Sequence, residues 1–119
     1  RGTYDSVNVG AVRNLIACAR AAGTRRLVVC SSAITIGAPD GQLGDERTLH
    51  RGSTITALEK SKLEAERLAL RARAHGLEVV VVNPGIVVAP GDPGWLGRLI
   101  GATVRGRAPI AGHAPLGWV

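Results

Sequence analysis

The runs LVVC at residues 27–30 and EVVVV at residues 78–82 decide the fold of this 119-residue chain. Each run is short, almost wholly apolar and rich in β-branched residues, which predicts a strand buried on both faces. Between the two runs, apolar positions at helical spacing predict a helix from about Ala57 to Ala74, and His75 and Gly76 then signal its end. Two such strands joined by a helix form a βαβ unit, so we expect the strands to pair in parallel.

The same alternation continues on either side of this unit. Apolar spacing predicts a helix from Asp5 to Ala22, stopped by Gly23. The Gly- and Pro-containing stretch from Ser31 to Ser53 predicts a long loop, and a loop of that length usually carries function. A short helix is predicted from about Trp95 to Arg105, before a Gly/Pro-rich tail, Pro109 to Val119, in which a strand could begin. This order of elements predicts an open, doubly wound α/β sheet.

The sheet is predicted to be incomplete. The pattern offers only two strands, and two parallel strands do not form a stable core by themselves. The chain also starts at Arg1 rather than Met and ends on the apolar pair Trp118 and Val119. We therefore expect a piece from the middle of a larger domain.

The composition argues against several classes of protein. An apolar fraction of 45% is normal for a globular protein, and no apolar run approaches the roughly 18 residues of a membrane span. The net charge is +6, yet the arginines are scattered and the aromatic residues are one tyrosine and two tryptophans, which leaves little for base stacking. From these patterns we expect neither a membrane segment nor a nucleic-acid partner. No secretory leader is visible in this sequence and cysteines are few, so we expect a cytoplasmic protein.

The cysteines and histidines do not predict a metal site or a disulfide framework. Cys18 and Cys30 are too few for a disulfide scaffold and lack metal-ligand spacing. We expect Cys30, at the end of a strand, to be a small buried residue. His50, His75 and His113 have no partner at ligand spacing.

Candidate site residues follow the two strands. In open α/β sheets the ligand crevice lies beyond the carboxyl ends of the strands. Ser31 and Ser32 follow the first strand, and Asn83, Pro84 and Gly85 follow the second. These small or backbone-exposing residues suit a nucleotide or nicotinamide crevice. The alternative is that the serine hydroxyls merely bond the turn backbone.

The second predicted helix carries a lysine in its apolar stripe. Leu58, Ala65, Ala69 and Ala72 lie on one face, and Lys62 falls within that face. Lysine is rarely buried without a partner. Either Lys62 bonds a cofactor hydroxyl under the crevice, or its stem packs inward while its ammonium group reaches water.

Taken in order, several segments of the chain resemble the extended short-chain dehydrogenase/reductases, the NAD-dependent epimerase/dehydratase family. Dihydroflavonol-reductase-like proteins and hopanoid-associated sugar epimerases look most similar. The resemblance covers nearly the whole chain at the family's spacing. The segments that carry it are NVGAVRNL at 8–15, AAGTRRLVVCSS at 21–32, SAITIG at 32–37, DE at 45–46, KSKLEAE at 60–66, VNPG at 82–85 and APGD at 89–92.

This resemblance implies an incomplete Rossmann-like NAD(P)-binding domain over residues 1–119 that lacks its N-terminal glycine-rich half. A substrate-binding region would begin at about residues 95–119. Ser32 matches the family's catalytic serine and Lys62 its catalytic lysine, which also bonds the nicotinamide ribose. Asn8 matches an asparagine in the helix before the strand. The cofactor-binding residues carried over are Ser31, Lys62, Asn83, Pro84 and Gly85, with NAD or NADP as the cofactor and no metal.

One departure from the family bears on catalysis. The family has tyrosine four residues before its lysine, where this chain has Leu58, and leucine cannot exchange a proton. The resemblance implies a fragment of an oxidoreductase or epimerase acting on a nucleotide sugar or a small carbonyl or hydroxyl compound, inactive as given. It also implies a homodimer of the full-length parent through the helix bearing Lys62. The alternatives are a non-catalytic dinucleotide-binding sensor or scaffold, and a decayed gene.

Overall fold

The computed structural model describes residues 2–37, 41–48, 50–91 and 93–107. The chain divides into two compact units, Arg1–Pro84 and Gly85–Val119, which are described separately. The predicted tail from residue 109 onward, with its apolar end, lies outside the described residues, as does part of the predicted loop at 38–40.

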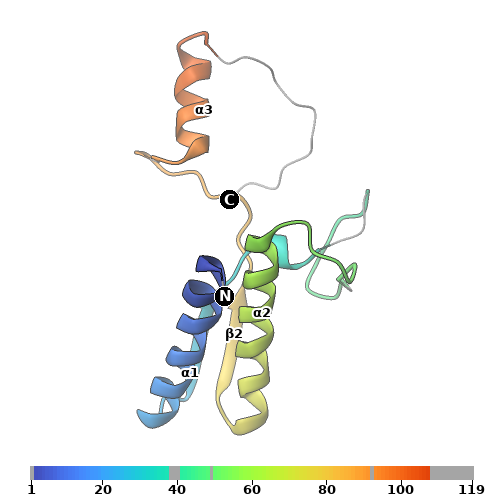
Figure 1. Cartoon of the computed structure of the whole chain (residues 1–119), viewed down its shortest axis with the longest axis vertical. Coiled ribbons are helices and arrows are strands. Elements are labelled where there is room, and N and C mark those ends of the chain that lie inside the picture. The colour runs from blue at the N-terminus through green and yellow to red at the C-terminus, as the bar shows by residue number, and fades with distance from the viewer. Residues whose placement is uncertain (1, 38–40, 49, 92, 108–119) are drawn as a thin grey trace. The chain divides into compact units, whose positions relative to one another are not determined.

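The first unit is built on the two predicted strands. β1 (Arg26–Cys30) and β2 (Glu78–Val82) pair in parallel, with Val28 opposite Val80. At the start of the ladder Arg26 donates a hydrogen bond of 2.8 Å to Glu78, and this bond holds the pKa of the Glu78 carboxyl below its usual range. The parallel pairing predicted from the apolar runs is confirmed. Figure 1 shows this unit, with α1, α2 and β2 labelled.

The helices also lie where the apolar spacing places them. α1 (Ala11–Ala21) follows a π-helical segment, η1 (Asp5–Gly10), so the predicted first helix is helical throughout but underwound at its start, where the bonding is of the i→i+5 type. α2 (Ala57–Arg71) continues into a 3₁₀ turn, η3 (Ala72–His75). Gly76 ends it in the left-handed conformation, with φ of 82°, which glycine adopts without strain.

One face of the sheet holds the core. Ile16 and Ala19 of α1 pack with Ala69 of α2, Ala72 of η3 and Val79 of β2. The buried side chains of α2 and η3 in this cluster are alanines, and Leu68 of α2 packs against its margin.

The opposite face of the sheet is open in the described chain. Val28, Val80 and Val82 are 61%, 41% and 49% exposed. The prediction of strands buried on both faces is therefore wrong for this chain, because the described helices α1 and α2 supply core residues to one face only. Cys30 also lies exposed, which corrects the expectation that it is buried.

The loop after β1 begins with a 3₁₀ turn, η2 (Ala33–Thr35), and then passes Gly37. Gly37 has φ of +56°, and a Cβ there would collide with the His50 ring. We expect Gly37→Ala to lower the free energy of unfolding by about 2 kcal/mol, the sum of left-handed strain and overpacking. Gly52→Ala is the matched control in urea denaturation, because Gly52 has φ of +86° with open space around it. Equal losses for the two variants would contradict a role for the ring contact.

The second unit contains α3 (Trp95–Val104), which matches the predicted short helix within one residue, and Leu96 is its buried residue. Among the residues that the structure describes, no helix is long and apolar enough to cross a membrane.

Candidate functional site

The segments that leave the two strands run side by side. The Ser31 amide donates to the Val82 carbonyl at 2.8 Å, and the Ala33 amide donates to the Pro84 carbonyl at 2.8 Å. Residues following β1 and β2 thus stay paired beyond the strands. The carboxyl edge of the sheet, where ligands bind in open α/β folds, is therefore an ordered surface.

A cavity of about 140 Å³ lies beside this edge, between the helices and the end of β1. Ser31 is 8% exposed, and its Oγ is buried with no hydrogen-bond partner among the described residues. A buried hydroxyl without a partner is unfavourable and marks a place where a ligand or water bonds. The cavity is lined by Val7, Asn8, Ala11, Val12, Val29, Cys30, Ser31, Lys62, Ala65 and Glu66.

The structure brings Lys62 to this cavity. Lys62 lies on α2, partly buried, and lines the same cavity as Ser31 and Asn8. Leu58, one turn earlier on the helix, is 39% exposed and does not belong to the buried stripe to which its spacing assigned it. The helix begins only at Ala57, so Leu58 extends past the edge of the core. Residues four apart share a helix face, so Leu58 lies on the Lys62 side of α2.

Asn8 is tied to the first turn of α2 through a buried serine. Its Nδ2 donates to Ser61 Oγ at 2.9 Å, and Ser61 Oγ donates to the Leu58 carbonyl at 2.9 Å. Ser61 is fully buried. These bonds fix η1 against the start of α2, and with it the backbone that carries Leu58 and Lys62.

Asn83 is the centre of a second network. Its Nδ2 lies 3.2 Å from Ser32 O, 2.9 Å from Thr35 Oγ1 and 2.8 Å from Glu66 Oε2, and shares its two protons among these three acceptors. Thr35 Oγ1 lies 2.7 Å from both Ser32 O and Glu66 Oε2, and can donate to either. The network locks the ends of both strands to α2. Sequence reasoning missed Thr35 and Glu66, although Glu66 follows Lys62 by one helical turn.

Ser32 itself is partly buried and caps the 3₁₀ turn. Its Oγ accepts a bond of 3.4 Å from the Ile34 amide, which agrees with the turn-bonding alternative for this serine. Its hydroxyl proton has no acceptor in that bond and is free to donate. Pro84 ends the first unit and Gly85 begins the second.

A buried carboxylate fastens the long loop to α2. The Glu59 side chain is 1% exposed and pairs with Arg51, while the Ile55 amide donates to it at 2.7 Å. His50 Nε2 lies 3.8 Å from the same carboxylate. Sequence reasoning missed this cluster too, because nothing in the residue pattern says that the loop returns to α2.

Comparisons with known proteins agree with this geometry. The sequence profile of the NAD dependent epimerase/dehydratase family matches residues 2–110. The chain is 39% identical over 106 residues to a putative dihydroflavonol 4-reductase from Synechocystis, covering 86% of this chain. It is 36% identical over 104 residues to sterol demethylase protein B of Methylococcus capsulatus, covering 85% of this chain. The structure also resembles that of MoeE5 in complex with UDP-glucuronic acid and NAD, with a TM-score of 0.70 and 38% identity over 83% of this chain.

The chain spans only part of these proteins: 31% and 32% of the two sequence relatives and 34% of the MoeE5 chain. Within that span the similarities confirm the predicted Rossmann-like α/β fold and the predicted family resemblance.

Proposed function

Because the chain belongs to the NAD-dependent epimerase/dehydratase family, we propose that the carboxyl edge of β1 and β2 is the nicotinamide side of an NAD(P) site. The observation that carries this proposal is the unpartnered, buried Ser31 hydroxyl in a cavity shared with Lys62. Residues from about 95 onward then belong to the region that meets the substrate, a nucleotide sugar or a small carbonyl or hydroxyl compound.

The residues present fit a nicotinamide nucleotide. Ser31 Oγ needs a partner, Lys62 is a partly buried donor that lines the same cavity, and Asn83 and Pro84 follow β2 at this edge. In the proposal Lys62 holds the ribose hydroxyls and Ser32 donates its free proton to the substrate oxygen. NAD(P), when bound, gives or takes the hydride.

Leu58 defines what this site lacks. The position four residues before Lys62 carries no proton donor, so the residues at this edge bind and orient but do not supply the acid/base group. General acid/base help contributes typically about 10²–10⁴-fold. We therefore infer binding without efficient turnover.

Lys62→Met tests the binding role. In the polypeptide encoded by the complete reading frame, we expect this change to weaken NADH or NADPH binding about tenfold, as one charge-assisted hydrogen bond is lost. Isothermal titration calorimetry with each nucleotide measures it. Lys60→Met is the matched control, since Lys60 lies exposed on the same helix. Unchanged affinity for Lys62→Met, with both variants folded, would refute the assignment.

A second function is favoured by the same leucine. A dinucleotide-binding sensor or scaffold needs Ser31 and Lys62 but no proton donor at residue 58. The two functions differ in whether a restored donor restores turnover.

A further inference from the structure

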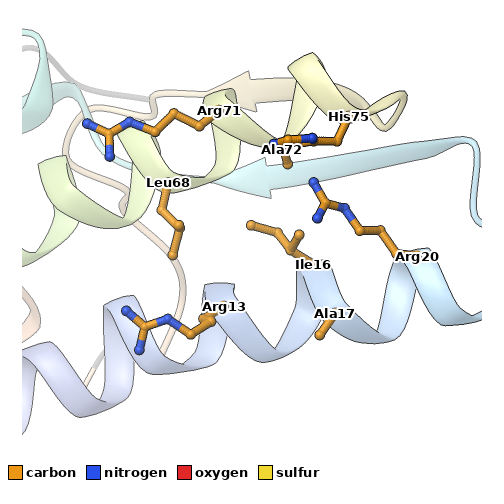
Figure 2. Close-up of a pocket in the computed structure, with 8 residues that line it drawn as sticks. All are labelled: Arg13, Ile16, Ala17, Arg20, Leu68, Arg71, Ala72 and His75. Atoms are coloured by element: carbon orange, nitrogen blue, oxygen red, sulfur yellow. The ribbon is translucent and has the colours of Figure 1, made fainter.

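Glu66 lines the same cavity as Lys62, one helical turn later on α2. Among the described residues, these two carry the charged side chains that line the cavity. The arginines Arg13, Arg20 and Arg71 line a separate hollow of about 310 Å³ between the two helices, as Figure 2 shows. Neither Lys62 nor Glu66 lines that hollow. The charge balance at the cavity therefore depends on whether Lys62 and Glu66 pair with each other.

Lys62 and Glu66 form no ion pair, although their spacing would allow one. Residues four apart on a helix lie within reach of each other, and a lysine and a glutamate at this spacing attract. Within the described part of the chain, the Lys62 ammonium group has neither an ion pair nor a hydrogen bond. Because a partly buried charge is usually paired, the unpaired ammonium group needs a physical reason.

The reason is that two other residues hold the Glu66 carboxylate. Its Oε2 lies 2.8 Å from Asn83 Nδ2 and 2.7 Å from Thr35 Oγ1. Thr35 is 3% exposed, so water has little access to its hydroxyl. Thr35 belongs to the turn after β1, and Asn83 follows β2. These bonds hold the carboxylate at the strand ends, where it does not pair with Lys62.

We propose that Glu66 is a positioning residue for Lys62, an inference that rests on the nucleotide site proposed above. Asn83 and Thr35 hold the Glu66 carboxylate, which leaves the Lys62 ammonium group unpaired for the nicotinamide ribose. A released carboxylate pairs with Lys62, and a nucleotide must then break that pair in order to bind. The network thereby couples the order of the two strand ends to the affinity for the nucleotide.

Asn83→Ala is the variant that releases the carboxylate, because it removes the 2.8 Å bond. In the polypeptide encoded by the complete reading frame, we expect the affinity for NADH or NADPH to fall about fivefold, the strength of a surface ion pair. Asn83→Ala/Glu66→Gln should restore the affinity, since a glutamine amide does not attract the ammonium group. Asn83→Ala/Glu64→Gln is the matched control, because Glu64 is exposed on the same helix, and it should bind as weakly as Asn83→Ala. Isothermal titration calorimetry measures all three.

Acylation of Lys62 gives a second readout that needs no nucleotide. Trace acetic anhydride reacts with the uncharged amine, so an ion-paired lysine is labelled more slowly than an unpaired one. Lys60, exposed on the same helix, is the internal reference in mass spectrometry. We expect the ratio of Lys62 to Lys60 labelling to fall in Asn83→Ala and to recover in Asn83→Ala/Glu66→Gln. Thr35→Val is a smaller change that takes the place of Asn83→Ala in both measurements if circular dichroism shows the alanine variant to be unfolded.

The outcomes separate this inference from the nucleotide site on which it rests. Unchanged nucleotide affinity in Lys62→Met would refute the nucleotide site, and the inference with it. Suppose instead that Lys62→Met weakens binding, but Glu66→Gln restores neither the affinity nor the labelling ratio of Asn83→Ala. The network would then be merely structural, and the inference alone would be overturned. Equal recovery with Glu64→Gln would also overturn it, because net charge rather than a specific pair would govern the affinity.

Discussion

Replacing Leu58 by tyrosine is expected to raise the rate of hydride transfer by about 10²–10⁴-fold. The new phenol stands one turn before Lys62 on the same face of α2, and a neighbouring lysine ammonium favours the phenolate. Leu58 is 39% exposed, so the larger ring does not enter the core. The measurement uses the polypeptide of the complete reading frame. With a dihydroflavonol, whose ketone accepts hydride, it is loss of reduced-nicotinamide absorbance; with a UDP-hexose and the oxidised nucleotide, where a hydroxyl carbon gives up hydride, it is gain of that absorbance.

The matched control is Leu58→Phe, which has the same ring without the hydroxyl. A gain with tyrosine and none with phenylalanine identifies proton transfer as the missing step. A similar gain with both would show that ring packing rather than acid/base chemistry raises the rate. No gain with either, alongside unchanged NAD(P)H affinity, would favour the sensor or scaffold function.

The strands and helices could be predicted because their signals are local. The β-branched runs at 27–30 and 78–82 mark the strands. Hydrogen bonds between residues close in sequence end α1 at Gly23. The Thr24 amide donates to the Ala19 carbonyl at 2.8 Å, and the Gly23 amide donates to the Arg20 carbonyl at 3.1 Å. Gly23 itself adopts a left-handed conformation with φ of +65°.

What could not be predicted depends on contacts between distant parts of the chain. Whether Val28 is buried depends on which layer covers its side of the sheet, and an apolar run carries no information on that. The Asn83 network joins Asn83 to Glu66, Thr35 and Ser32, which precede it in the chain by 17, 48 and 51 positions. Lys62 at the cavity was predictable, because helix periodicity placed it on the inner face; the burial of Glu59 was not, because its partners arrive from the loop.

The position of Glu59 leads to the largest expected change in stability. Removing one partner of a buried ion pair strands the other charge, at a cost of about 3–5 kcal/mol. The Arg51 side chain is 24% exposed, so water can partly solvate its charge. We therefore expect Glu59→Ala to lower the free energy of unfolding by about 3 kcal/mol, the lower end of that range. Removing the Glu59 side chain also removes the acceptor of the Ile55 amide, which donates to it at 2.7 Å. We therefore expect the loop to detach from α2.

Urea denaturation measures the change, with Glu64→Ala as the matched control because Glu64 is exposed on the same helix. Glu59→Gln separates charge from hydrogen bonding. Its amide oxygen can still accept from the Ile55 amide but does not neutralise Arg51. Its loss in free energy of unfolding should therefore lie between those of Glu59→Ala and Glu64→Ala. Limited proteolysis should cut the stretch from residue 50 to residue 55 faster in Glu59→Ala than in Glu64→Ala. Equal urea midpoints and equal cleavage for these two variants would mean that the loop is held by other contacts, and that the buried carboxylate does not anchor it.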